Sequence, residues 1–563
     1  MAFNEVLESI GGVGRFQISQ ITFLLISVCL IACHNFLQNF TAAVPDHHCK
    51  PLLPTNQTLP SSYTQSTAEG VLLKVPVPID QNRKPEKCLQ FAMSWWRLLS
   101  PNATVAVGDS ATQVHTELCT GGWVYDVSVF ESTIVTEWNL VCELQNLRDV
   151  AQSLYMAGVL VGAGVFGVLS DRFGRRKPLI WSYLQIAIAG TVTAFLPSFS
   201  SYCAFRFLAG MTFSGIMLNS LSLILEWMPN KGRTVAGALL GYFVTFGQIV
   251  LAGVAYGVRN WRWLQLSVSA PFFIIFVCSW KLPESPRWLL LHNKAQVAVQ
   301  NLRKVAAMNG KSKEGEKINK EVLHSHMQME AASLKSRRSV FDLFRSPILR
   351  RVTCCLMVVW FSSSFSYYGL AMDVQKFGLN IFVVQVLFGA IDLPVVLLST
   401  LAMVFIGRRF AMAGFLSLAG LLVFVNMFVP DELQTLRTVQ AALGKGCLAS
   451  SFIGAYLYSG ELYPTEIRQT GMGFVSIQAR LGAMVAPLVY VLRDSFPVLP
   501  PIIFGAAPLL AGVSACFLME TRHLPLLETI AEMERRSRNV PSMETAEEIC
   551  LQQVGRSLLK ESV

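Results

Sequence analysis

The chain reads Glu226-Trp-Met-Pro229-Asn-Lys-Gly-Arg233 after one apolar segment and Glu461-Leu-Tyr-Pro464-Thr-Glu-Ile-Arg468 after another. Both stretches follow the pattern E-x-x-P-x-x-x-R, and their first residues, 226 and 461, lie 235 positions apart. Two further motifs recur at almost the same spacing: Gly174-Arg175-Arg176 with Gly407-Arg408-Arg409, and Glu284-Ser285 with Glu520-Thr521. Because three motifs keep nearly one offset, we infer that the chain contains a duplicated unit.

The composition indicates a membrane protein. Of the 563 residues, 52% are hydrophobic and only 15% are charged, and the mean hydropathy is +0.45. Soluble domains carry roughly a quarter charged residues. The net charge of +10 does not indicate a nucleic-acid partner, because the basic residues form short clusters between apolar runs. We therefore expect an all-α protein embedded in the lipid bilayer, with no nucleic acid bound.

Twelve segments are long enough to span a bilayer, which takes roughly 20 apolar residues. They lie at 16–36, 147–167, 179–198, 203–224, 235–256, 262–281, 350–370, 381–403, 411–429, 437–458, 471–492 and 499–518. Together with the repeat, they predict two pseudo-repeated six-helix halves, at 1–281 and 350–520. A polar linker with short helices, 282–349, joins them, and a tail follows at 521–563. Parallel duplication of a six-helix unit is the plan of transporters whose halves rock about a central site.

The polar loop 41–146 is predicted to lie outside the cell. Three glycosylation sequons begin at Asn39, Asn56 and Asn102, and the loop contains Cys49, Cys88, Cys119 and Cys142. Sequons and cysteines together indicate an oxidising compartment. Four cysteines allow three pairings, among which the sequence does not choose. The basic clusters fall on the opposite side of twelve spans, so we expect a plasma-membrane protein with both termini cytoplasmic.

The repeated motifs also have a mechanical interpretation. Asp171 and Arg175 can form a charged latch around the turn at Gly174, and each half carries a companion pair, Glu226 with Arg233 and Glu461 with Arg468. Glu284 joins the same network. Latches of this kind hold helices together in one conformation and release them in another. The alternative is that the arginines only mark the cytoplasmic side.

Longer motifs carry a family resemblance. They are the stretch from Gly167 to Lys177, the run P-E-S-P-R-W at 283–288, and the segments Leu37–Ala43, Ser132–Trp138 and Gly460–Thr465. Together they resemble the major facilitator superfamily and, within it, the organic anion transporter branch of the organic ion transporters. The resemblance implies secondary transport of organic anions (carboxylates and sulfate conjugates), with a counter-anion exchanged. It implies neither an enzyme nor a cofactor or metal, and the sequence shows no nucleotide-binding or zinc motif.

Arg480 is the first candidate for binding the anion. It lies about ten residues into its span, near the bilayer midplane, and no acid lies one turn away. Its planar fork suits carboxylate or sulfate, although an ion pair with Asp392 on another span is the alternative. Lys445, between two glycines, is a second candidate with a structural alternative. Arg206, near the outer end of its span, is expected to snorkel rather than to contact substrate.

Aromatic residues on the same spans predict a wall for the body of an amphipathic anion. The aromatic candidates are Tyr242, Trp360, Tyr367, Tyr368, Phe452 and Tyr456. The alternative for any one of them is ordinary packing. The resemblance places these six residues in the family's pocket, together with Asn35 and Ser476.

Two further predictions concern selectivity and partners. Where relatives are expected to carry a lysine associated with dianions, this chain has Val396, so we expect a preference for small monoanions. An organic cation or zwitterion carrier on the same fold is the competing function. The tail after about residue 530, which ends Glu-Ser-Val, is a hypothetical docking segment for a scaffold protein.

Overall fold

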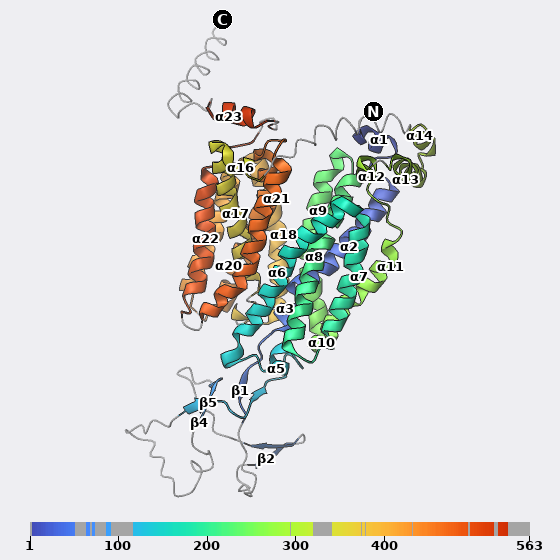
Figure 1. Ribbon diagram of the computed structural model, residues 1–563. Helices are drawn as coiled ribbons and strands as arrows, with labels where there is room; N and C mark the ends of the chain where they lie inside the picture. The colour runs from blue at the N-terminus through green and yellow to red at the C-terminus, as the bar shows by residue number, and fades with distance from the viewer. Residues whose placement is uncertain are drawn as a thin grey trace, which may run out of the picture.

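The computed structural model describes residues 3–50, 64–67, 70–73, 86–91, 116–292, 294–318, 340–372, 374–377, 379–430, 432–493, 496–522, 527 and 529–538. The sequons at Asn56 and Asn102 and the final Glu-Ser-Val lie outside these residues. Within them the chain is mainly helical, and long helices run side by side in two groups (Figure 1).

The first group, here called the N-half, contains the long helices that precede the linker. They are α2 (Arg15–Phe36), α6 (Asn146–Phe173), α7 (Arg176–Thr193), α8 (Phe199–Trp227), α9 (Asn230–Gly257), and the pair α10 (Trp261–Ser269) and α11 (Pro271–Ser279). Pro271 separates α10 from α11, so these two short helices together make the sixth span.

The second group, the C-half, contains six long helices after the linker. They are α17 (Pro347–Met372), α18 (Ile381–Phe405), α19 (Arg408–Phe428), α20 (Gln434–Leu462), α21 (Arg468–Val489) and α22 (Leu499–Cys516). In the part of the chain that the structure describes, ten helical segments are apolar and long enough to cross a membrane by composition. The more polar helices α7 and α20 complete the twelve predicted spans.

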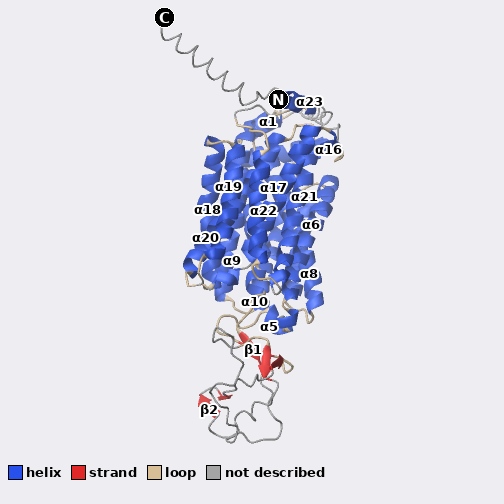
Figure 2. Cartoon of the chain, turned by 90° about the vertical axis from the view of Figure 1, so that its left-hand side faces the viewer, coloured by secondary structure: helices blue, strands red, loops and turns tan. Residues whose placement is uncertain are grey.

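The two ends of the bundle differ (Figures 1 and 2). One end, the loop face, carries three two-stranded sheets: β1 (His47–Cys49) with β6 (Trp123–Tyr125), β2 (Thr64–Thr67) with β3 (Gly70–Leu73), and β4 (Leu89–Phe91) with β5 (Thr116–Leu118). Disulfides join Cys49 to Cys119 and Cys88 to Cys142, which selects one of the three pairings that the sequence allowed. Short helices α3 (Gln38–Thr41) and α5 (Ile134–Trp138) lie at the same end.

The other end, the termini face, carries the described parts of the linker and both terminal helices. Its helices are α1 (Phe3–Ser9), α12 (Pro286–Leu291), α13 (Ala295–Met308), α14 (Ser312–Glu316), α16 (Asp342–Arg345) and α23 (Ile530–Arg538). Asn309 ties α1 and α2 to α13, because its side chain accepts from Phe16 N and donates to Ile10 O and Gln17 Oε1. At the C-half, Ser346 Oγ donates to Glu534 Oε1 at 2.6 Å, which fixes α23 beside α17.

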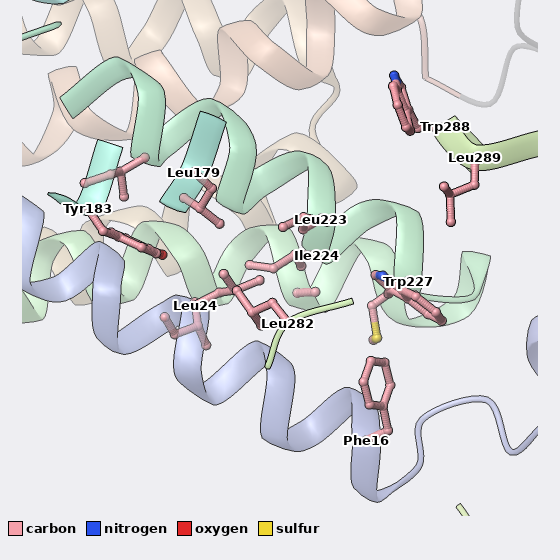
Figure 3. Packing of buried hydrophobic residues seen from close by; sticks show 14 of the residues in the cluster. Phe16, Leu24, Leu179, Tyr183, Leu223, Ile224, Trp227, Leu282, Trp288 and Leu289 are labelled. Carbon is pink, nitrogen blue, oxygen red and sulfur yellow. The ribbon is translucent and has the colours of Figure 1, made fainter. Parts of the chain in front are cut away.

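An apolar core at the termini end of the N-half unites α2, α7 and α8 with the first linker helices (Figure 3). Phe16 packs edge-on against Trp227 with the ring centres 5.0 Å apart, and both side chains are buried. Leu24, Leu223 and Trp288 belong to the same cluster. This packing makes the linker helices α12 and α13 part of the N-half.

Most contacts of the duplicated motifs occur in both halves. In the N-half, Arg175 contacts Asp171 at 2.9 Å and Glu226 at 3.5 Å, and Glu284 Oε1 accepts from Arg175 N. The last arginine of the motif, Arg233, donates Nε to Met228 O at 3.1 Å. These contacts place the predicted latch residues in one cluster at the termini face.

In the C-half, Arg408 contacts Glu461 at 3.1 Å, and Arg468 Nε donates to Tyr463 O at 3.1 Å, five residues back as in the N-half. Glu520 Oε1 accepts from Arg408 N at 2.9 Å. Burial raises the pKa of Glu520 and backbone N–H donors lower it, and the net result is a pKa below its usual value. The repeat inferred from spacing is therefore a repeat of structure, but the pairing differs from the prediction. Glu461 pairs with Arg408, whereas Arg468, its predicted partner, donates to a backbone carbonyl.

Glycine is required at the two latch turns. Gly174 has φ +95° and Gly407 has φ +119°, conformations that side chains rarely adopt. A Cβ atom would lie 2.2 Å from Glu284 Oε2 at the first turn and 2.7 Å from Glu520 Oε2 at the second. The glycine lets each carboxylate approach the backbone N–H groups that it accepts from.

Candidate functional site

Arg480 lies near the middle of α21. Its Nη1 donates to Ser476 O at 3.1 Å and to Ser476 Oγ at 3.2 Å, one turn earlier in the same helix. Neither acceptor is charged, and the side chain is only half-buried. The alternative partner, Asp392, is paired with Lys445 instead. Arg480 therefore offers a positive charge that its described hydrogen bonds do not neutralise.

Tyrosines from two other helices lie near this guanidinium, and one of them contacts the N-half. Tyr368 of α17 and Tyr456 of α20 both lie within electrostatic range of Arg480. Asn35, near the end of α2, donates Nδ2 to Tyr368 Oη at 3.4 Å. Arg480, Tyr368, Tyr456 and Asn35 thus bring both halves of the molecule to one place, as the sequence predicted for them.

An aromatic cluster in the C-half includes Tyr456 and the two rings that pack against it. The ring centres of Trp360 and Tyr456 are 4.4 Å apart, and Phe452 lies 5.5 Å from each of them. Tyr456 is 42% exposed, whereas Trp360 is fully buried and donates Nε1 to Ser459 Oγ at 2.9 Å. The prediction that Trp360 contacts substrate directly is therefore corrected: in this conformation it supports Tyr456 from behind.

Lys445 is also corrected. It is fully buried, and its Nζ lies 2.5 Å from Asp392 Oδ2, which is itself 2% exposed. The ammonium stands over the Tyr367 ring at 4.9 Å and donates to Gln248 Oε1 of α9 at 3.4 Å. With its charge already paired, Lys445 does not offer a second cation to an anion. The structural alternative for Lys445 is the one that the geometry supports.

Two further predicted tyrosines, Tyr367 and Tyr242, lie on α17 and α9. Tyr367, over Lys445, packs edge-on against Tyr368 at 5.3 Å, so the buried ion pair touches the Arg480 cluster through one aromatic neighbour. Tyr242 of α9 is half-buried and follows Gly241, where a Cβ atom would lie 3.7 Å from Ile453 of α20. This turn of α9 therefore lies against the C-half.

A polar contact joins the two halves towards the loop face. Asn39 of α3 donates Nδ2 to Ala371 O at 2.9 Å and to Gln385 Oε1 at 3.1 Å, and Gln248 donates to Gln385 O at 3.4 Å. An apolar cluster at this end also draws from both halves, with Phe36 and Phe382 among its members. The predicted sequon at Asn39 is contradicted, because the amide nitrogen that would carry a glycan is buried and hydrogen-bonded.

Sequence reasoning missed Gln248 and Gln385, which bridge the halves beside Lys445. Both are amides inside apolar spans and both are buried. A polar side chain in such a position costs free energy unless it is hydrogen-bonded. This cost can be recognised from the sequence, and it indicates that each glutamine forms a hydrogen bond with another helix.

The sequence matches the family model described as "Sugar (and other) transporter" over residues 125–533. It is 59% identical to solute carrier family 22 member 20 of Mus musculus over 570 aligned residues, covering all of both chains. It is 50% identical to solute carrier family 22 member 6-A of Xenopus laevis, covering 95% of this chain and 94% of the relative. These matches run through both halves of the bundle.

Solved structures confirm the fold. The inward-open structure of the xylose transporter XylE from E. coli covers 73% of this chain and 92% of its own, with 18% identity and a TM-score of 0.56. A structure of XylE described as a major facilitator superfamily proton:xylose symporter gives a TM-score of 0.51 at 20% identity. The chain has the major facilitator fold of membrane transporters, not that of an enzyme, and it belongs to solute carrier family 22.

Proposed function

We propose that the protein is a secondary transporter that carries small organic anions, carboxylates and sulfate conjugates, across the plasma membrane. The observation that carries this proposal is Arg480: a half-buried guanidinium within a span, whose described acceptors, Ser476 O and Oγ, are neutral. A charge within a membrane span is costly unless it has a counter-charge or a function. A carboxylate or sulfate bound by the guanidinium fork provides that counter-charge.

The surroundings favour an anion with an apolar body. Tyr456 packs against Phe452 in the C-half, and Tyr368 accepts a hydrogen bond from Asn35 of the N-half. Flat aromatic groups suit a benzoate-like or aliphatic body, while Arg480 orients the charged end. Val396, in place of a basic residue, favours monoanions over dicarboxylates.

Alternating access explains how the anion crosses. The described hydrogen bonds of Asn39, Gln248 and Tyr368 join the halves on the loop-face side of Arg480. At the termini face, the latches centred on Arg175 and Arg408 each bind acids of their own half. We assign this arrangement to a state closed at the loop face, from which rocking of the halves exposes Arg480 to the other side.

The chemistry of the two faces supports one orientation in the membrane. The loop face carries two disulfides, which form in an oxidising compartment, and the basic turns lie at the opposite face. Both termini are therefore assigned to the cytoplasm, and the closed face is the extracellular one. Exchange for a counter-anion is the proposed coupling.

A carrier of organic cations is the competing function, and it requires an acid within the substrate site. Asp392 is an acid inside a span, but Lys445 neutralises it and both are buried. The charge that remains beside the aromatic cluster is that of Arg480. The geometry thus favours the anion.

The test is uptake into proteoliposomes of a radiolabelled aromatic monocarboxylate, a dicarboxylate and a quaternary ammonium. We expect the monocarboxylate to be taken up best and to be stimulated when the vesicles are preloaded with anion. Arg480→Asp should abolish anion uptake at normal protein incorporation, while Arg350→Gln, at an exposed arginine of α17, should leave it unchanged. Equal uptake of both carboxylates contradicts the monoanion preference, and ammonium uptake by the unmodified protein contradicts the anion proposal.

A further inference from the structure

A second cation lies deep in the N-half. Arg206 of α8 is 1% exposed, so the expectation that it snorkels to the membrane surface is wrong. It is among the largest fully buried side chains of the described residues. Unlike Arg480, it lies outside the aromatic cluster and packs against α2, α3 and α6.

The groups that Arg206 contacts are all neutral. Its Nη2 donates to Gln38 Oε1 and to Gln152 Oε1, each at 3.3 Å, and its guanidinium stands 4.4 Å from the centre of the Tyr155 ring. Gln38 is held in this orientation because its Nε2 donates to Arg148 O at 2.7 Å. Amide oxygens and an aromatic face attract a cation only partially, whereas the buried Lys445 has a full counter-charge in Asp392.

Several hydrogen-bond donors in this group have no partner among the described residues. They are Arg206 Nε, Gln152 Nε2 and the Tyr155 hydroxyl. Gln152 is 3% exposed and Tyr155 is fully buried, so bulk water does not satisfy them. Buried N–H and O–H groups around an uncompensated positive charge are the chemistry that recognises an anion.

We propose that Arg206, Gln152 and Tyr155 form a binding site for a small inorganic monovalent anion, of which chloride is the probe. Size limits the ligand, because α6 and α8 pack with their backbones in contact here. A Cβ atom at Gly158 would lie only 2.1 Å from Phe207 O. An organic anion does not fit between helices packed in this way, whereas a single halide requires little more than the space of a water molecule.

The site has a route to the Arg480 cluster. Tyr155, under the Arg206 guanidinium, lies within electrostatic range of Tyr368, which is itself within range of Arg480. An anion at Arg206 therefore changes the electrostatic environment of Tyr155, the residue closest to the guanidinium in this direction. This coupling rests on the proposed function, but binding of the inorganic anion does not.

The binding test uses the purified full-length protein and measures its melting temperature as chloride replaces gluconate at constant ionic strength. A ligand that binds only the folded state raises the melting temperature, here by about 3 °C at saturation. We expect Arg206→Gln to abolish the chloride-dependent shift and Arg480→Gln to retain it. Loss of the shift in Arg480→Gln, or its persistence in Arg206→Gln, overturns the assignment to Arg206.

A milder variant covers the case in which Arg206→Gln fails to fold. Gln152→Leu keeps the charge and removes one donor, so it should raise the half-saturating chloride concentration at least about fivefold. In addition, bromide should give a density peak beside Arg206 Nε in a structure of the protein prepared in bromide. No chloride shift in the unmodified protein, or an ordered water in place of the peak, overturns the proposal, and neither result affects the test of organic anion uptake.

Discussion

Arg480 and Lys445 are cations on consecutive helices of the C-half, and on sequence both were candidates for binding an anion. In the structure, Lys445 is fully buried 2.5 Å from Asp392, while Arg480 is half-buried and donates to the neutral oxygens of Ser476. One charge is thus part of the internal structure and the other remains available. The comparison shows that the availability of a cation, rather than its presence in a span, decides whether it can bind substrate.

The largest expected effect comes from removing one member of the buried pair. Lys445→Met leaves Asp392 buried without a counter-charge, and breaking a buried ion pair in this way costs about 3–5 kcal/mol. We expect a sharp fall in melting temperature and in the yield of folded protein, measured by thermal unfolding after purification.

The matched control is the double variant Lys445→Met with Asp392→Leu, which removes both charges. Replacing a buried pair by apolar residues is often neutral, so this variant should regain most of the lost stability. If the single variant is as stable as the unmodified protein and still transports, Lys445 is not a structural cation and the comparison fails.

A smaller effect is expected from Arg480→Lys, which keeps the charge but replaces the planar fork by a point charge. A bidentate carboxylate contact is lost, so anion uptake should fall about tenfold, equivalent to about 1.4 kcal/mol. Because Arg480 has no structural counter-charge among its described contacts, the melting temperature should remain unchanged. Uptake kinetics and thermal unfolding of the same preparation separate the two effects, and undiminished uptake shows that charge alone suffices.

The smallest effect is expected from Ser476→Ala, which removes the hydroxyl acceptor that helps to orient Arg480. Loss of one hydrogen bond of this kind costs roughly 0.5–1.5 kcal/mol, so we expect a few-fold rise in KM for the anion. Ser514→Ala is the control, because Ser514 is also half-buried in a span but donates only to a backbone carbonyl one turn earlier, Leu510 O of α22. Equal KM values for the two variants contradict an orienting role for Ser476.

Much of the fold was predictable because its signals are local. Apolar runs of spanning length predicted the helices, and the spacing of three motifs predicted the duplication. Arg175 and Arg408 each contact the acid of the E-x-x-P-x-x-x-R motif and a second carboxylate through the backbone N–H. The two turns require glycine in a left-handed conformation, which is also a local constraint.

The candidate site was predictable only in part. Arg480, Tyr368, Tyr456 and Asn35 come together as expected, whereas Trp360 lies behind the site and Asn39 is buried between the halves. Burial of a side chain within a span depends on which neighbouring helix faces it. Helical periodicity shows that two residues share a face, but not what covers that face.

By itself, the sequence determined that this protein has two repeated six-helix halves and that positive charges lie inside its spans. Only the tertiary structure decided which of those charges is paired: Asp392 lies 53 residues from Lys445 along the chain, yet 2.5 Å from it in space. It also decided that Arg206 is buried among Gln38, Gln152 and Tyr155 and not at the membrane surface. The physical reason is that a charge within a span is governed by its partners on other helices, and helix packing, not sequence spacing, brings those partners together.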